Sequence, residues 1–267
     1  MRSIILIFVL FFTIVSKSYA DNPDSYGCNE STISVGITDT GVMYHNGQGV
    51  DADLFSLLSE ITDCKFNLIP IARENAFNLM EQGEIDLVPS VTREPHREAF
   101  AWFIPYYEIR FLLLENGNTL PPISHLDQLK TIEGASIARA SGSGYGTYFN
   151  YHLAEMGSLG MVRLYPDYGK TIQAFLNQEV DATLSLPQIY RVFFAPGEEP
   201  FPIRIADVSP ENPVAISLML GKHQFSSAQI ANWLRVIEAI RLDGRLQAIL
   251  EQYVSTEEAA SMLGLEL

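Results

Sequence analysis

Short apolar runs alternate with segments whose apolar residues recur every three or four positions along the first ninety residues. In one such segment Leu54, Leu58 and Ile61 recur at helical spacing behind Asp51 and Asp53, either of which can cap a helix. The alternation predicts strands at 33–37, 65–70 and 85–90, and helices that begin near residue 51 and at residue 74. Strands that alternate with amphipathic helices are typical of layered α/β domains.

A second series of the same kind follows an extended stretch at 109–115. It predicts strands and short helices in alternation, at 126–129, 136–140, 147–156, 161–165, 168–177, 182–185 and 187–194. An irregular, proline-rich segment at 196–213 includes one short strand at 203–206. The chain then ends with an apolar run at 214–220 and with helices at 226–242 and 246–253.

These two series are of similar size, and together they predict an α/β protein with two lobes. We expect residues 21–113 to form the first part of lobe 1, residues 114–207 to form lobe 2, and residues 208–267 to return to lobe 1 and end in helices. The chain would cross between the lobes near 113–116 and again near 205–213, which makes a two-strand hinge. The expected binding site is the cleft between the lobes, near the carboxyl ends of the strands.

The N-terminus has the features of a secretory signal peptide. Arg2 supplies a positive charge, an apolar run follows at 4–15, and Ser18-Tyr19-Ala20 places small residues before a cleavage site, so residues 1–20 are expected to be removed. A membrane anchor is the alternative, but the run is shorter than the roughly 20 apolar residues of a spanning helix. Cys28 lies too far from the run to carry a lipid. We therefore expect a free, soluble protein, and we place it in a periplasm.

Charge and composition narrow the range of partners. The formal net charge is −15, and the loss of Arg2 and Lys17 with the signal peptide makes it −17. An acidic surface repels nucleic acid and anionic lipid, so neither is an expected partner. Two cysteines and five scattered histidines show no metal-ligand spacing, and the sequence predicts neither a metal nor a cofactor.

The two cysteines, Cys28 and Cys64, each precede a predicted strand. If those strands are parallel neighbours, their amino ends lie side by side, and an oxidising compartment makes a disulfide between the cysteines reasonable. Two free buried thiols are the alternative.

Several motifs resemble family 3 of the bacterial extracellular solute-binding proteins, which includes the polar amino-acid receptors of ABC transporters. They occur in the family's order along nearly all of the exported chain: Gly49-Val50-Asp51-Ala52-Asp53-Leu54, Gly83-Glu84-Ile85-Asp86, Ser90, Thr92, Arg97, Phe103-Ile104-Pro105-Tyr106-Tyr107, Leu126 to Lys130, Glu179-Val180-Asp181-Ala182, and Ile237 to Gly244 followed by Tyr253. The resemblance implies the periplasmic-binding-protein type II fold. It also implies a monomeric receptor that delivers a small carboxylate-bearing ligand to the membrane permease of an ABC importer.

The same resemblance implies a set of ligand contacts. We predict them at Arg97, Ser90, Thr92, Ser143, Gly144, Tyr145, Asp39, Tyr44 and Ser185, with Arg73 as a weaker candidate. Arg97 is the first choice, because a planar guanidinium matches the two oxygens of a carboxylate. A packing or surface arginine is the alternative. The loop at 142–146 leads into a predicted helix, so its backbone can approach an anion closely.

One position departs from the family in an informative way. The family's amino-acid receptors hold the ligand's ammonium with an Asp five residues after the Asp of the Val-Asp-Ala turn, and here that position is Leu186. An ammonium buried without a carboxylate costs several kcal/mol. An ordinary α-amino acid is therefore in doubt, although Ser185, Gln188 and Tyr190 offer neutral hydrogen bonds. A carboxylate without the amine becomes the alternative.

Two other functions use the same cleft. A sensory receptor would bind its ligand in the same way and signal through a membrane partner. Some members of this fold class are dehydratases, which need a general acid or base in the cleft, and Glu94 and Asp39 are the only candidates. No Ser-His-Asp set is evident in the sequence, so we expect a binding protein and not an enzyme.

Overall fold

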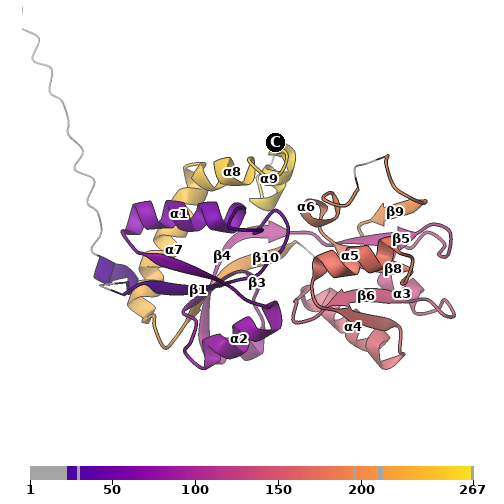
Figure 1. Ribbon diagram of the computed structural model, residues 1–267, viewed down its shortest axis with the longest axis horizontal. Helices are drawn as coiled ribbons and strands as arrows, with labels where there is room; N and C mark the ends of the chain where they lie inside the picture. The colour runs from indigo at the N-terminus through magenta and orange to yellow at the C-terminus, as the bar shows by residue number, and fades with distance from the viewer. Residues whose placement is uncertain (1–22, 29–30, 195–196, 210–212, 266–267) are drawn as a thin grey trace, which may run out of the picture.

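The computed structural model describes residues 23–28, 31–194, 197–209 and 213–265, and it consists of two α/β lobes that lie side by side (Figure 1). Each lobe has one five-stranded sheet with helices packed against it. The signal peptide predicted at 1–20 lies outside the described residues. Within the described part of the chain, no helix combines the length and the apolar character that a membrane span requires.

The sheet of lobe 1 has the strand order β2-β1-β3-β10-β4. Its strands are β1 (Ile33–Ile37), β2 (Phe66–Pro70), β3 (Leu87–Thr92), β4 (Ala101–Ile109) and β10 (Val214–Gly221). The first three strands pair in parallel, as crossover helices require, whereas β10 runs antiparallel between β3 and β4.

Helices cover both faces of this sheet. They are η1 (Pro23–Tyr26), α1 (Val50–Thr62), α2 (Arg73–Glu81), η2 (Pro95–Ala99), α7 (Ser227–Leu242), α8 (Arg245–Leu250) and α9 (Thr256–Met262). In Figure 1, α1 and α8 lie on one side of the sheet and α2 on the other. Ala76 and Met80 of α2 pack into a small apolar cluster of their own with Val88 and Met219, separate from the main core.

Lobe 2 repeats the topology, with the strand order β7-β6-β8-β5-β9. Its strands are β5 (Leu112–Asn116), β6 (Ile137–Ala140), β7 (Val162–Tyr165), β8 (Ala182–Ser185) and β9 (Ile203–Ala206). Its helices are α3 (Leu126–Leu129), α4 (Thr147–Ser158), α5 (Tyr168–Leu176) and α6 (Pro187–Tyr190). The strands β6, β7 and β8 are parallel, and β5 runs antiparallel between β8 and β9.

The chain crosses twice between the sheets. The first crossing lies at 110–111, because β4 ends at Ile109 and β5 begins at Leu112. This corrects the sequence-based crossing at 113–116, which falls inside β5. The return crossing lies between the end of β9 at Ala206 and the start of β10 at Val214.

The strand β4 is not evident from the sequence, because its alternation of apolar and polar positions is broken. The register between β4 and β10 shifts at Ile216 and Ser217, which pair with Tyr107 and Pro105 and leave Tyr106 without a partner. Such a bulge places an extra residue in one strand and redirects its side chain. The short helix α9 was also missed.

The disulfide between Cys28 and Cys64 is confirmed. Ile33 of β1 pairs with Phe66 of β2 in parallel register, so the segments that precede the two strands come together at one end of the sheet.

Candidate functional site

A small cavity lies between the two lobes. Its lining comes from segments that follow the carboxyl ends of strands in both sheets, such as Thr40 after β1, Gly142 after β6 and Leu186 after β8. Ligands of open α/β sheets bind at such ends, because the loops there carry variable side chains over a rigid frame. Arg97, Ser90, Thr92, Ser143 and Gly144, all predicted from the sequence, line this cavity.

Arg97 is held by the short helix η2 and is 7% exposed. Its guanidinium lies 3.6 Å from the centre of the Phe77 ring, and its Nη1 donates to the carbonyl of Thr92 at 3.4 Å. Its Nε has no hydrogen-bond partner, and no carboxylate of the described residues forms an ion pair with it. Burial lowers the pKa of Arg97 to about 10, and nearby Glu94 opposes this change. The side chain is therefore a buried cation with an unused donor.

Ser90 belongs to a buried hydrogen-bond network. Its Oγ lies 2.9 Å from each carboxylate oxygen of Asp51 and 3.1 Å from the hydroxyls of both Tyr106 and Tyr107. Adjacent strand residues normally point to opposite faces, but the bulge at Tyr106 lets both rings reach the same hydroxyl. The backbone of Ser90 has φ +56°, an uncommon conformation that its amide supports by donating to the Tyr106 hydroxyl.

Asp51, in the first turn of α1, is 1% exposed. Burial raises its pKa to about 6, because the charged form loses its hydration, while hydrogen bonds from Ser90 and Tyr106 and the charge of Arg73 act in the opposite direction. The sequence marks Asp51 as a helix cap and as part of a motif, but it does not reveal the link to Ser90. The carboxylate supports the cavity wall from behind and does not line it.

Lobe 2 closes over Thr92 with a glycine loop. A Cβ atom on Gly144 would lie 2.0 Å from the Thr92 Oγ1, and one on Gly142 would lie 2.9 Å from the Glu74 Cα. Gly142 also has φ +67°, which favours glycine. The hydroxyl of Thr92 is buried without a hydrogen-bond partner at this contact. The loop needs its glycines because the two lobes approach each other closely here.

Two further contacts join the lobes. Asn150 Nδ2 of α4 donates to Glu94 Oε1 at 3.0 Å, and Arg191, after α6, forms an ion pair with Glu258 of α9. The sequence offered Glu94 as a candidate general acid or base. In the structure it supplies the acceptor for a hydrogen bond between the lobes.

Four predicted site residues do not line this cavity. Tyr145 is fully buried in the core of lobe 2, and its hydroxyl accepts from the amide of Ala140 at 2.9 Å. Ser185 is also fully buried, and Tyr44 is 7% exposed. Asp39 is exposed and lies 2.7 Å from His45 Nδ1, in an adjoining hollow between the lobes. Leu186, by contrast, faces the cavity.

Arg73 was rated low from the sequence, yet it lines the cavity at the start of α2. Apolar side chains form much of the remaining wall, and sequence analysis did not foresee them: Met43, Phe77, Phe111, Ile189 and Ile216. Phe77 falls within the helix predicted from residue 74, and no sequence signal separates it from the core.

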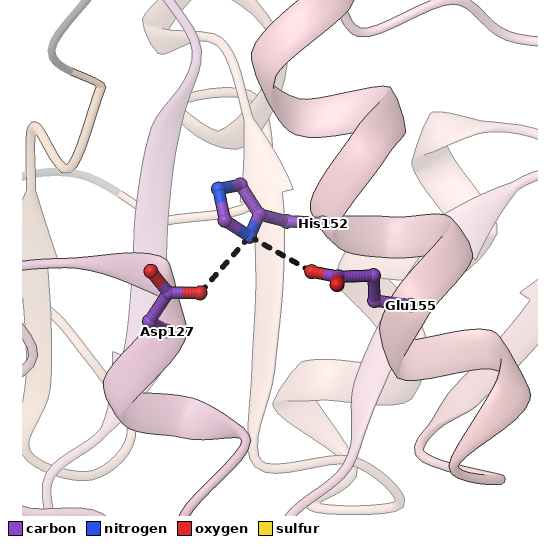
Figure 2. Close-up of side chains that lie close together, drawn as sticks. All are labelled: Asp127, His152 and Glu155. Atoms are coloured by element: carbon purple, nitrogen blue, oxygen red, sulfur yellow. Dashed lines mark ion pairs between the residues drawn. The ribbon is translucent and has the colours of Figure 1, made fainter.

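A separate polar cluster lies on α3 and α4 of lobe 2, where Asp127, His152 and Glu155 converge (Figure 2). The His152 Nδ1 atom lies 3.2 Å from Asp127 Oδ1 and 3.6 Å from Glu155 Oε2. These three residues have the chemistry of metal ligands, but the ammonium of Lys130 already lies 2.7 Å from Asp127 and 2.5 Å from Glu155. The charge of the Lys130 side chain thus balances these carboxylates.

The sequence matches the model of the bacterial extracellular solute-binding proteins, family 3, over residues 33–256, and the chain belongs to this family. The family and the type II periplasmic-binding-protein fold expected from the sequence are both confirmed.

Solved structures with the same fold have several roles. An ancestral arginine-binding protein bound to arginine is 19% identical, covers 84% of this chain and 98% of its own, and has a TM-score of 0.69. A histidine kinase sensor domain with similarity to periplasmic binding proteins is 16% identical, with 84% and 96% covered and a TM-score of 0.66. An ancestral amino-acid-binding protein, a precursor of cyclohexadienyl dehydratase, is 17% identical, with 83% and 95% covered and a TM-score of 0.65. At these identities the likeness establishes the fold alone.

Proposed function

We propose that this protein is exported to the periplasm, captures a small carboxylate-bearing ligand between its lobes, and presents it to the permease of an ABC importer. The observation that carries the proposal is the Arg97 guanidinium, buried in the cavity between the lobes with an unpartnered Nε. A buried cation without a partner is costly, and a carboxylate supplies both the charge and the two acceptors that the guanidinium can use.

Closure of the lobes is the mechanism by which binding would be reported to a partner. Arg97 and Thr92 belong to lobe 1, whereas Ser143 and Gly144 belong to lobe 2, so a ligand in the cavity contacts both. A ligand shifts an open–closed equilibrium only by the difference in its affinity for the two states. Contacts from both lobes exist only in the closed state, and they supply that difference.

Binding is better supported than catalysis. No acidic side chain lines the cavity among the described residues, and Asp51 lies behind Ser90 and does not face the space. A dehydratase would need a positioned acid or base in contact with its substrate. A sensory role uses the same cavity, and the likeness to a histidine kinase sensor domain makes it the second candidate. Co-purification with a permease, as against a membrane kinase, distinguishes the two.

The first test replaces Arg97 with Met and measures carboxylate binding by calorimetry on the exported chain. The variant keeps the length of the side chain but loses the charge, and we expect affinity to fall at least about 100-fold, since a charge-assisted pair contributes roughly 3 kcal/mol when buried. The control is Arg245→Met, on the surface of α8, where the arginine pairs with Asp243. Unchanged binding by Arg97→Met would rule out the proposed role of Arg97.

A further inference from the structure

The cavity contains a second cation besides Arg97. Arg73 begins α2, is half-buried, and its Nη1 donates to the carbonyl of Pro89 at 3.2 Å. Within the described residues no carboxylate lies within ion-pairing distance of it. A guanidinium at a helix N-terminus also faces the positive end of the helix dipole. Burial lowers the pKa of Arg73, and the charge of the buried Asp51 carboxylate opposes this change only in part, so an anion in the cavity would stabilise the guanidinium further.

Five arginines elsewhere in the described part of this acidic chain form ion pairs with carboxylates, whereas Arg139, Arg163, Arg235 and Arg241 lie outside the cavity lining and form none. The pairs are Arg93–Glu98, Arg110–Asp207, Arg191–Glu258, Arg204–Glu115 and Arg245–Asp243. Among the described residues, neither Arg73 nor Arg97 forms an ion pair with a carboxylate, and the charge of Arg73 is among the causes that lower the pKa of Arg97. Two like charges thus face one small space.

In the described part of the chain, the remaining lining offers no carboxylate that could pair with a positive ligand group. Among the described residues it includes no Asp or Glu, and its other side chains are hydroxyls or apolar groups. An ammonium placed here would lose its hydration and meet two guanidinium groups. The apolar side chains of Met43, Phe111, Leu186 and Ile189 instead suit a hydrocarbon frame.

We propose that the ligand is a dicarboxylate without an amino group, with one carboxylate on Arg97 and the other on Arg73. This inference rests on the proposed function and narrows it to a ligand class. Each guanidinium offers a planar pair of donors to one carboxylate, so two guanidiniums select a dianion over a monoanion. Inorganic phosphate is also an anion of high charge, but it leaves the apolar wall without a contact.

The experiment is calorimetry on the exported chain with succinate, glutarate, adipate, their monocarboxylate counterparts of equal length, glutamate and inorganic phosphate. We expect one dicarboxylate to bind at least tenfold more tightly than its monocarboxylate, than glutamate and than phosphate. In Arg73→Met the preference for the dicarboxylate over the monocarboxylate is expected to disappear, while Arg245→Met keeps it. A far-ultraviolet circular dichroism spectrum and a melting temperature that match those of the native chain verify that Arg73→Met is folded.

A second variant keeps the test decisive if Arg73→Met does not fold. Leu186 is the N-cap of α6, a position that favours Asp, so Leu186→Asp is compatible with the helix while it adds a carboxylate to the cavity. We expect this variant to lose dicarboxylate affinity at least tenfold through charge repulsion. Tighter binding of glutamate or of a monocarboxylate by the native chain overturns the dicarboxylate inference and leaves the carboxylate receptor intact. Failure of every carboxylate, with phosphate or nothing bound, overturns both.

Discussion

Asp51 and Ser90 illustrate how a buried acid can shape a binding site without touching the ligand. Ser90 lines the cavity, its hydroxyl contacts both oxygens of Asp51, and Tyr106 donates to the same carboxylate at 3.1 Å. These hydrogen bonds fix the direction of the Ser90 side chain. The cost is a carboxylate removed from water, and burial is the largest cause of its raised pKa.

This cost predicts a specific pH dependence of stability. The pKa of Asp51 is about 6 in the folded protein against an ordinary value of 3.8, so the native state binds more protons than the unfolded state between these values. The free energy of unfolding therefore falls as pH rises through this window, by up to about 3 kcal/mol. Asp51→Asn keeps an acceptor for the hydroxyls and removes the titration.

Urea unfolding at pH 4 and pH 8 measures the effect. We expect the stability of Asp51→Asn, relative to the native protein, to rise between the two pH values. Asp63→Asn, at the C-cap of the same helix, removes an exposed carboxylate and controls for the loss of one negative charge. If both variants show the same pH dependence relative to the native chain, the burial of Asp51 has no thermodynamic consequence.

The sequence predicted which segments face the cleft and five of the residues that line the cavity, but it misplaced others by as little as one position. Ser185 and Leu186 are neighbours at the end of β8, and the serine points into the core while the leucine faces the cavity. Successive strand residues alternate between faces, so a shift of one position reverses the assignment. Tyr145 was misplaced for a related reason, because nothing in a glycine loop indicates which residue turns inward.

At the level of whole elements the sequence was more informative, because apolar periodicity accumulates over many residues. Strands β1, β8 and β9 have the predicted bounds. The long helix α7 also follows its predicted range closely. Apolar periodicity did not predict β4. The bulge at Tyr106 breaks the alternation of this strand and brings the hydroxyls of Tyr106 and Tyr107 to the same Ser90 hydroxyl. That departure depends on tertiary contacts with Asp51, which no local pattern encodes.

The disulfide gives a prediction for the elements β1 and β2. Cys28 and Cys64 are separated by 36 positions, and closing a loop of that length restricts the unfolded chain by about 4 kcal/mol in the chain-entropy description. We expect Cys28→Ser/Cys64→Ser to lose stability of that order in urea unfolding. Ligand affinity should change less than twofold, because neither cysteine lines the cavity. A large loss of affinity in a variant that is still folded would contradict this separation of roles.

Contacts between the lobes describe the molecule in a closed arrangement. The Glu94–Asn150 hydrogen bond, the Arg191–Glu258 ion pair and the approach of Gly144 to Thr92 all join lobe 1 to lobe 2. An exposed ion pair contributes only about 0.2–1 kcal/mol, so these contacts bias closure without locking it. Under the proposed function, a bound ligand would supply most of the free energy that holds the lobes together.

Gly144→Ala tests this dependence on closure. Gly144 does not have a positive φ, so alanine fits its backbone, but the added Cβ would lie 2.0 Å from the Thr92 Oγ1 when the lobes are closed. We expect the lobes to fold normally, with an unchanged melting temperature in the absence of ligand. The affinity for the ligand should fall at least tenfold, because the penalty of at least about 1.4 kcal/mol applies only to the closed state.

The matched control is Gly157→Ala in α4, where a Cβ meets nothing within 4 Å. Alanine there is expected to raise the melting temperature slightly through its helix propensity and to leave affinity unchanged. Calorimetry gives the affinities, and small-angle scattering gives the radius of gyration with and without ligand. Gly144→Ala could instead bind as tightly as the native chain and contract by the same amount on binding. That result would show that ligand capture does not need the contact between the glycine loop and Thr92.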